Sequence, residues 1–219
     1  MPETASNAQK SGTKSVRGRP RKSEAEESAL RTRVIGVARD LFAHDGYEGV
    51  SMRRVAQAVG CSPAQLYTLF GGKRDLLRHI WEDAFSALAD ELREASSEPD
   101  PLKRLRALGD TWCRFWLANP DHYRSIFLIE DRVSEPGERY FVETSESLGA
   151  LDLIAEAVSE CMEKRLLEPD DKAAVSQLFL CGLQGVVFNL ITIPEFPWAA
   201  KEQMTTRMIT ALIDGISPH

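Results

Sequence analysis

Apolar residues recur at helical spacing along most of the chain. Between residues 24 and 44, Leu30, Val34 and Ala38 share one stripe, and polar residues fill the positions between them. No segment shows a sustained alternation of apolar and polar positions, which would predict a β-strand. The pattern therefore predicts an all-α fold.

Glycine and proline positions divide this pattern into about nine helices. The first begins at Ser23 or Glu24 and ends near Gly46. The later ones are expected to begin near residues 51, 62, 73, 101, 119, 138, 170 and 199. We expect the seventh to span 138–167 after a loop at 131–137, the eighth to end near 193 and the ninth to span 199–213. Residues 178–193 are strongly apolar but short for a membrane span, which favours a buried helix.

The segment 51–77 has the signals of two short helices joined by a tight turn, followed by the start of a third. Ser51 is a typical N-cap, and Gly60 suits the left-handed conformation that often ends a helix. Ser62 then caps the next helix, and Pro63 takes its first position, where a missing N–H has no consequence. This arrangement is a helix-turn-helix, which makes double-stranded DNA the leading partner.

Several residues of this segment coincide with a known motif, and we give them together: Ser51, Val55, Ala56, Ala58, Gly60, Ser62, Leu66, Tyr67, Phe70, Lys73 and Leu76. With the helix before it, over residues 27–77, the segment resembles the DNA-binding motif of the tetracycline-repressor-like (TetR) family of bacterial regulators. The resemblance implies a three-helix DNA-binding head on an all-helical ligand-binding and dimerisation body. We therefore expect a basic arm at 1–23, a DNA-binding domain at 24–77 and a ligand-binding and dimerisation domain at 78–219.

The outward face of the second short helix supplies the candidate base contacts. Gln65 is the best candidate because its amide can pair with adenine N6 and N7, and Thr68 and Ala64 are candidates for thymine methyl groups or the backbone. The resemblance implies phosphate contacts by Tyr67 and Lys73, and the two capping serines are further candidates for phosphate. The alternative for each residue is a plain surface or capping role. The predicted contacts in the head are Ser51, Ser62, Ala64, Gln65, Tyr67, Thr68 and Lys73.

The arm carries six Lys and Arg and no acidic residue between positions 10 and 22. Its centre, Arg17-Gly18-Arg19-Pro20-Arg21-Lys22, resembles an AT-hook, whose extended chain lies in a narrow A·T minor groove. The predicted arm contacts are Arg17, Arg19, Arg21 and Lys22. The alternative is a basic tail that binds phosphates without sequence preference.

Charge is divided unevenly between the two parts of the chain. The whole chain has a net charge of −6, but residues 1–80 carry 14 Lys/Arg and 8 Asp/Glu, and residues 81–219 carry 13 and 25. The first part can therefore bind a polyanion such as DNA, which repels the acidic remainder of the chain.

Aromatic and apolar residues of the predicted body could line a ligand pocket in which a few polar groups orient the ligand. The predicted lining is Trp112, Phe115, Trp116, His122, Tyr123, Phe127, Phe179, Leu183, Gln184, Phe188 and Asn189. The alternative is that these residues form an ordinary core.

The last two predicted helices are expected to form a homodimer through a four-helix bundle. The predicted interface is Val175, Leu178, Gly182, Val186, Asn189, Met204, Met208, Leu212 and Ile213. The chain is thus expected to be a homodimeric transcriptional regulator of a palindromic operator, most simply a repressor released by a small apolar or amphipathic ligand. The alternative is a DNA-architectural or activator protein that uses the AT-hook-like arm without a ligand switch.

The sequence gives no reason to expect enzymatic activity, a metal or a cofactor. The four cysteines are scattered without a Cys-x-x-Cys pair or a His at metal-ligand spacing, and no nucleophile–base pair stands out. Cys61 lies in the predicted turn, where oxidation could block DNA binding, although a small structural turn residue is the simpler interpretation. The start of the chain lacks the apolar run of a signal peptide. We therefore expect a cytoplasmic protein with no membrane contact.

Overall fold

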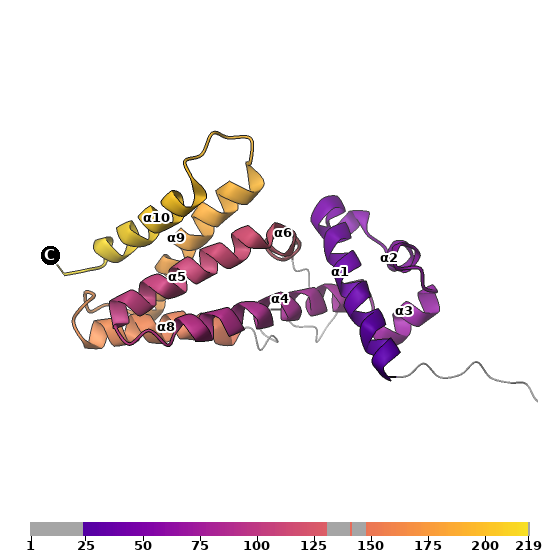
Figure 1. Cartoon of the computed structure of the whole chain (residues 1–219), viewed down its shortest axis with the longest axis horizontal. Helices are drawn as coiled ribbons and strands as arrows, with labels where there is room; N and C mark the ends of the chain where they lie inside the picture. The colour runs from indigo at the N-terminus through magenta and orange to yellow at the C-terminus, as the bar shows by residue number, and fades with distance from the viewer. Residues whose placement is uncertain (1–23, 131–140, 142–147, 219) are drawn as a thin grey trace, which may run out of the picture.

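In a computed structural model of the protein, the structure describes residues 24–130, 141 and 148–218. Within these ranges the chain forms helices and no β-strand, which confirms the all-α prediction. Figure 1 shows a small head, built from the first three helices, at one end of an elongated helical body. The long helix α4 begins in the head and runs into the body.

The head consists of α1 (Glu24–Gly49), α2 (Met52–Val59) and α3 (Pro63–Leu69), which pack on the first turns of α4. Gly46 interrupts α1 with φ of 67°, at the position where the sequence predicted the first helix to end. Buried side chains from the three helices and α4 make one separate core: Leu30, Val34, Ala38, Phe42, Val50, Met52, Val55, Ala56, Val59, Leu66, Phe70, Leu76, Leu77 and Ile80.

The body is built around α5, which contacts α4, α8, α9 and α10. Its helices are α4 (Lys73–Ala95), α5 (Pro101–Ala118), α6 (Pro120–Phe127), α8 (Leu148–Glu163), α9 (Lys172–Thr192) and α10 (Lys201–Gly215). The helix α6 is short and lies against α1 of the head, so the head contacts the body through α6 as well as through α4.

One predicted helix end is wrong. The helix expected to reach residue 167 ends at Glu163, because Arg165 adopts a left-handed conformation with φ of 58°. The N–H groups of Leu166 and Leu167 then donate to the carbonyl oxygen of Cys161, at 2.8 and 3.3 Å, and close the end of the helix. The start predicted near 138 and the loop predicted at 131–137 lie outside the described residues.

The helix α9 is the one element in the described ranges that is long and apolar enough to cross a membrane. In the fold it packs against α5, α8 and α10, as the sequence predicted for a buried helix. Its contact with α10 is close, because a Cβ added to Gly182 would lie 2.6 Å from Cδ1 of Leu212. A larger residue at position 182 would therefore require the Leu212 side chain to shift.

Candidate DNA interface and effector site

The helix α2 has both of its ends fixed by the residues that the sequence singled out. The Ser51 side chain accepts a hydrogen bond from the backbone N–H of Arg54 at 3.2 Å. At the other end Gly60 adopts the left-handed conformation, and its N–H reaches the carbonyl oxygens of Ala56 and Gln57. These caps fix where α2 stops and therefore where the turn leads into α3.

The helix α3 begins with a capping box. The Ser62 hydroxyl accepts from the backbone N–H of Gln65 at 3.2 Å, and Oε1 of Gln65 accepts from the backbone N–H of Ser62 at 3.2 Å. Leu66 is fully buried beneath the helix and anchors it to the head core. The opposite face of α3 carries Ala64, Tyr67 and Thr68, all exposed, and Tyr67 is 56% exposed.

The far end of α3 is held by an arginine from α1. Arg31 donates to the carbonyl oxygen of Leu69 at 2.9 Å, and its guanidinium lies 4.7 Å from the centre of the Phe70 ring. The same group contacts Nε2 of His79 on α4 at 2.8 Å. The orientation of α3 is thus fixed by both of its neighbours, α1 and α4.

Two candidate DNA contacts already have intramolecular partners. The side-chain oxygen Oε1 of Gln65 accepts one hydrogen bond in the capping box, so a bidentate contact with adenine must use its second lone pair or break the bond to Ser62. The Thr68 hydroxyl donates to the backbone carbonyl oxygen of Gln65 at 2.7 Å, which leaves the methyl group and the hydroxyl lone pairs of Thr68 for a partner. Both residues stay predicted contacts.

Lys73, the candidate phosphate contact at the start of α4, lies 3.9 Å above the ring of Tyr47. Burial lowers the pKa of this lysine, and the nearby Glu48 carboxylate partly opposes that shift. The cation–π contact holds the ammonium group at the N-terminal end of α4, where an anion is favoured.

The predicted DNA contacts include no residue from within α2, although two arginines are exposed on this helix. Arg53 is exposed and makes no ion pair within the part of the chain that the structure describes. Its neighbour Arg54 is bound to the end of α1, through Asp45 Oδ2 at 2.7 Å and the carbonyl oxygen of Gly49 at 2.9 Å. The available signal was the outward helical position of Arg53, one turn before Gln57.

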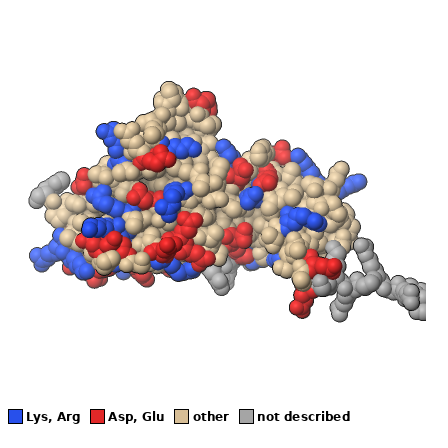
Figure 2. Space-filling model, in the orientation of Figure 1, with Lys and Arg blue, Asp and Glu red and all other residues tan. Residues whose placement is uncertain are grey.

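The charge of the head itself is close to neutral. Residues 24–80 contain eight Lys/Arg and seven Asp/Glu, so the basic excess of the first part of the chain belongs to the arm. Figure 2 shows basic side chains at the end of the head away from the body, acidic ones elsewhere on the head, and both kinds mixed over the body. The predicted arm contacts Arg17, Arg19, Arg21 and Lys22 lie outside the described residues.

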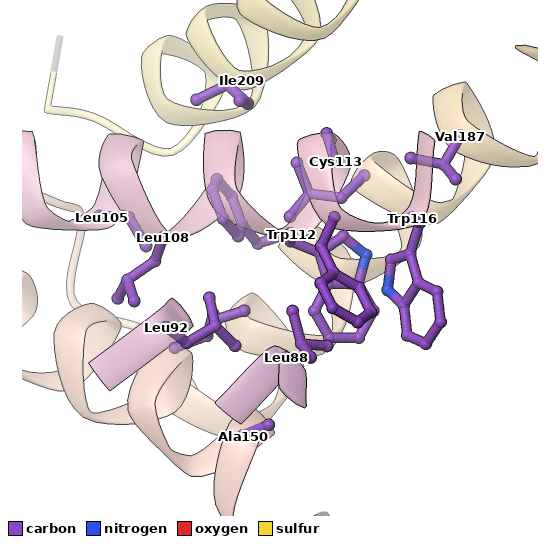
Figure 3. Close-up of a cluster of buried hydrophobic side chains, with 14 of the residues drawn as sticks. Leu88, Leu92, Leu105, Leu108, Trp112, Cys113, Trp116, Ala150, Val187 and Ile209 are labelled. Carbon is purple, nitrogen blue, oxygen red and sulfur yellow. The ribbon is translucent and has the colours of Figure 1, made fainter. Parts of the chain in front are cut away.

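In the body, five of the predicted pocket residues come together as a cluster of aromatic rings, shown in part in Figure 3. Trp116 is central, with ring centroids at 4.9 to 6.0 Å from its four aromatic neighbours in the predicted set. The aromatic cluster is Trp112, Phe115, Trp116, Tyr123 and Phe127. Phe85 of α4 joins it at 5.6 Å from Trp116. Burial raises the pKa of Tyr123 to about 12, so its hydroxyl stays neutral.

The other predicted pocket residues are placed differently. Phe179 and Leu183 are buried in the body core. Phe188 is 43% exposed, and the Asn189 amide donates to the carbonyl oxygen of Gly185 on its own helix at 2.7 Å. Oε1 of Gln184 is buried without a hydrogen-bond partner in the described residues.

His122 lies at the contact between head and body and not in the aromatic cluster. Its Nε2 is 3.2 Å from Nη1 of Arg39 on α1. Burial lowers the pKa of His122, and the Arg39 charge lowers it further, both favouring the neutral ring that can accept from Arg39. Arg39 also pairs with Asp40 at 2.7 Å.

A surface cleft of about 530 Å³ opens between α5 and α10, away from the aromatic cluster. None of the predicted pocket residues lines it. Its lining is Asp110, Arg114, Leu117, Ala118, Lys201, Glu202, Thr205 and Thr206.

The outer face of α9 carries a stripe of exposed small and apolar residues. They recur at three- and four-residue steps, as one face of a helix requires. The α9 stripe is Leu178, Cys181, Gly185 and Phe188. Two residues predicted to lie in the dimer interface, Val175 and Val186, are instead buried within the body core, as is Ile213 of α10.

Comparison with known proteins agrees with this architecture. Residues 34–80 match the family model described as bacterial regulatory proteins, tetR family. The chain is 25% identical over 181 residues to the transcriptional regulator AcrR of Shigella flexneri, covering 80% of this chain and 84% of that protein. It is 21% identical over 197 residues to the regulator UidR of Escherichia coli K12, covering 88% and 95%.

Solved structures share the fold. The fatty acid degradation regulator FadR from Bacillus halodurans matches with a TM-score of 0.73 and 21% identity, covering 90% of this chain and 98% of that one. AibR, solved in complex with isovaleryl coenzyme A and operator DNA, matches with a TM-score of 0.68 and 23% identity, covering 84% and 98%. The helix-turn-helix head and the helical body define a DNA-binding transcriptional regulator. Residues 34–80 carry the DNA-binding domain of the TetR family, and the fold of the chain is that of a TetR-family regulator of solved structure.

We predict that Gln65 contributes both to base recognition and, through its cap, to the stability of the head. Gln65→Ala should relax preference at one base pair per half-site at a cost of about 1–3 kcal/mol, and should also destabilise the head by weakening the cap. Lys73→Ala should weaken all sequences alike and lower the salt slope by about one. Binding to a set of operator variants over a salt series, with unfolding curves for each protein, separates these effects. An unchanged base preference in the Gln65 variant would remove it as a base reader.

Proposed function

We propose that this protein is a homodimeric repressor that binds a palindromic operator through α3 and the basic arm, and that a small apolar or amphipathic ligand in the body releases it. The proposal places its action in the cytoplasm, where DNA and the ligand are both accessible. The observation that carries it is the position of α6, which takes part in the aromatic cluster on one side and contacts α1 of the head on the other.

The α6 residues that contact the aromatic cluster and the α6 residue that contacts α1 are neighbours in the chain. Tyr123 and Phe127 lie 6.0 and 5.1 Å from Trp116, between ring centroids. The residue before Tyr123 is His122, which meets Arg39 of α1. A ligand that parts these rings would move α6, and α6 cannot move far without displacing α1. The second route is α4, whose Phe85 belongs to the body and whose first turns belong to the head.

Displacement of the heads matters because a dimer binds two half-sites at a fixed spacing. Half-sites lie about one helical turn apart or a multiple of it, so a change in the distance or tilt of the two α3 helices costs affinity. The ligand must therefore bind the DNA-incompetent form more tightly than the DNA-bound form. AibR is a relative solved with both a coenzyme A thioester and operator DNA, which supports a ligand-responsive mechanism for this fold.

The α9 stripe supports the dimer. Gly185 has open space around its Cβ position, and Leu178 and Phe188 offer apolar side chains on either side of it. A second copy packed about a two-fold axis would cover these residues and form a four-helix bundle with α10. Met204, Met208 and Leu212 of α10 are half-buried, and Leu212 already packs on Gly182 of its own protomer.

A second prediction tests the link from ligand to operator. With operator fragments selected from bound genomic DNA, a compound that binds the body should weaken operator binding by about 5–150-fold. Arg39→Ala should reduce this coupling while leaving the compound's own stabilisation of the protein intact, because Arg39 lies outside the aromatic cluster. Arg33→Ala, an exposed change on the same helix, is the matched control. Operator titration and thermal shift are measured together for a panel of apolar and cationic compounds. If compounds that raise Tm leave wild-type operator affinity unchanged, the repressor–inducer mechanism is wrong.

A further inference from the structure

Two hydrogen-bond donors are buried in the aromatic cluster without acceptors. Nε1 of Trp112 and Nε1 of Trp116 have no hydrogen-bond partner in the described residues, although their side chains are 2% and 0% exposed. The two indoles come from successive turns of α5, and their ring centroids are 6.0 Å apart. Figure 3 shows the nitrogen-bearing edges of both rings turned toward the space between them.

An unpaired donor in a core is unfavourable, because folding removes its water and returns no hydrogen bond. Phenylalanine fills an aromatic position without that cost, and it does so at neighbouring positions of this cluster, Phe85, Phe115 and Phe127. The indole N–H groups and the Tyr123 hydroxyl are thus the polar groups of an otherwise apolar cluster. Each can be satisfied by an acceptor atom on a bound molecule.

The surroundings restrict the charge of that molecule. The polar residues that the described chain buries are Thr111, Ser125, Ser176 and Thr205, none of them ionisable. Burial raises the pKa of Tyr123 and Cys113 to about 12 and that of Cys161 to about 11, so these buried groups are uncharged as well. A carboxylate or phosphate drawn into the aromatic cluster would lose its hydration without gaining a counter-ion. An indole N–H is a donor only, so the bound atom must be an acceptor. A carbonyl or ether oxygen meets both conditions.

The shape of the site also restricts the molecule. The two indoles are surrounded by ring faces and edges, with Trp116 contacting Phe115, Tyr123 and Phe127. Flat aromatic groups gain offset-stacked or edge-to-face contacts in such surroundings beyond the burial of their area. We infer that the effector is an uncharged, flat aromatic molecule with at least one acceptor oxygen, and that the indole N–H groups of Trp112 and Trp116 donate to that oxygen. This inference rests on the proposed function, because it names the ligand class of the proposed effector site.

Three matched tricyclic probes test the chemistry. The probe 9-fluorenone is flat, neutral and bears one carbonyl, fluorene lacks the oxygen, and fluorene-9-carboxylate is an anion. The full-length protein should bind fluorenone about five- to tenfold more tightly than fluorene, the effect of a neutral hydrogen bond in a buried site, and the carboxylate most weakly. Trp112→Phe and Trp116→Phe should bring fluorenone affinity down toward that of fluorene while leaving fluorene affinity unchanged. Trp198→Phe is the control, since its Nε1 already donates to the carbonyl oxygen of Ile193.

A measurement on the wild-type chain keeps the test independent of variant folding. In protein labelled with ¹⁵N at tryptophan, fluorenone should shift the indole N–H resonances of Trp112 or Trp116 downfield, as hydrogen bonding does, and leave that of Trp198 in place. Any of four results would overturn the inference. Fluorenone and fluorene could bind equally, neither could bind, the carboxylate could bind more tightly than fluorenone, or the tryptophan variants could lose affinity for both neutral probes equally. Unmoved indole resonances on saturation with fluorenone would do the same, with buried water then the acceptor.

Operator titration in the same samples separates this inference from the proposed function. If fluorenone binding depends on the two indoles but leaves operator affinity unchanged, the ligand class stands and release by ligand fails. If a charged compound releases the operator while fluorenone shows no dependence on the indoles, release stands and the ligand class fails.

Discussion

Phe188→Glu is expected to split the dimer and lower operator affinity by about 10²–10⁴, because a single head loses the effective concentration that its partner supplies. Phe188 is exposed on the α9 stripe, so the substitution costs the isolated protomer little. In a two-fold interface each new carboxylate lies close to the partner's apolar stripe or to its own copy, and either placement is unfavourable.

Because Phe188 is exposed, its substitution tests the dimer interface more specifically than a substitution on α10. Leu212 packs on Gly182 within the protomer, so a charge there would disturb folding as well as assembly. Leu178→Glu, at the other end of the stripe and 54% exposed in the wild type, should behave like Phe188→Glu. Ala87→Glu, which places the same charge on the exposed side of α4, is the control and should leave both dimer and affinity unchanged. Sedimentation that shows intact dimers for both α9 variants would place the interface elsewhere.

The head could be predicted almost residue by residue because its signals are local. The ends of the two short helices are fixed by Ser51, Gly60 and Ser62, which form hydrogen bonds to backbone groups within five residues, and by Pro63 at the first position of α3. The turn between the helices follows from those four residues. Local signals of this kind do not depend on the rest of the fold.

The faces of α9 could not be predicted in the same way. This helix is apolar on nearly every side, so spacing does not distinguish Phe179, which is buried, from Phe188, which is exposed. The difference arises because α5, α8 and α10 cover one side of α9, and that depends on the whole body. The sequence analysis therefore assigned Phe188 to the pocket and Val186 to the dimer, whereas Phe188 is exposed and Val186 is buried in the body core.

Three other features of single residues could not be predicted from the sequence either. His122 looked like a polar group for a pocket, yet its partner is Arg39, 83 residues earlier in the chain. Gln65 looked free to read bases, but it completes the cap of its own helix. The early end of α8 depends on the backbone of Arg165, a residue type with no preference for the left-handed region.

Deletion of residues 2–22 is expected to remove most of the salt dependence of DNA binding. The arm holds six Lys and Arg, while residues 24–80 have a net charge of only +1. If all six contact phosphates, the slope of log K against log salt should fall by about five for each protomer on the operator. Over a change from about 50 to 200 mM salt, that slope corresponds to roughly a thousandfold loss of affinity per protomer that the shortened protein would not show. Binding of both proteins to one operator across a salt series gives the two slopes, and equal slopes would show that the arm stays off the DNA.

The same deletion can distinguish minor-groove insertion from simple charge. If Arg19 and Arg21 enter a narrow groove, the loss of affinity should be larger on operators with A·T flanks than on those with G·C flanks. Replacing both arginines by lysine keeps the charge, so the salt slope should hold while the preference for A·T flanks declines, because Arg is the residue favoured in narrow grooves. An equal loss on both flanks, with no effect of the lysine replacements, would leave the arm as a basic tail that binds phosphate without regard to sequence.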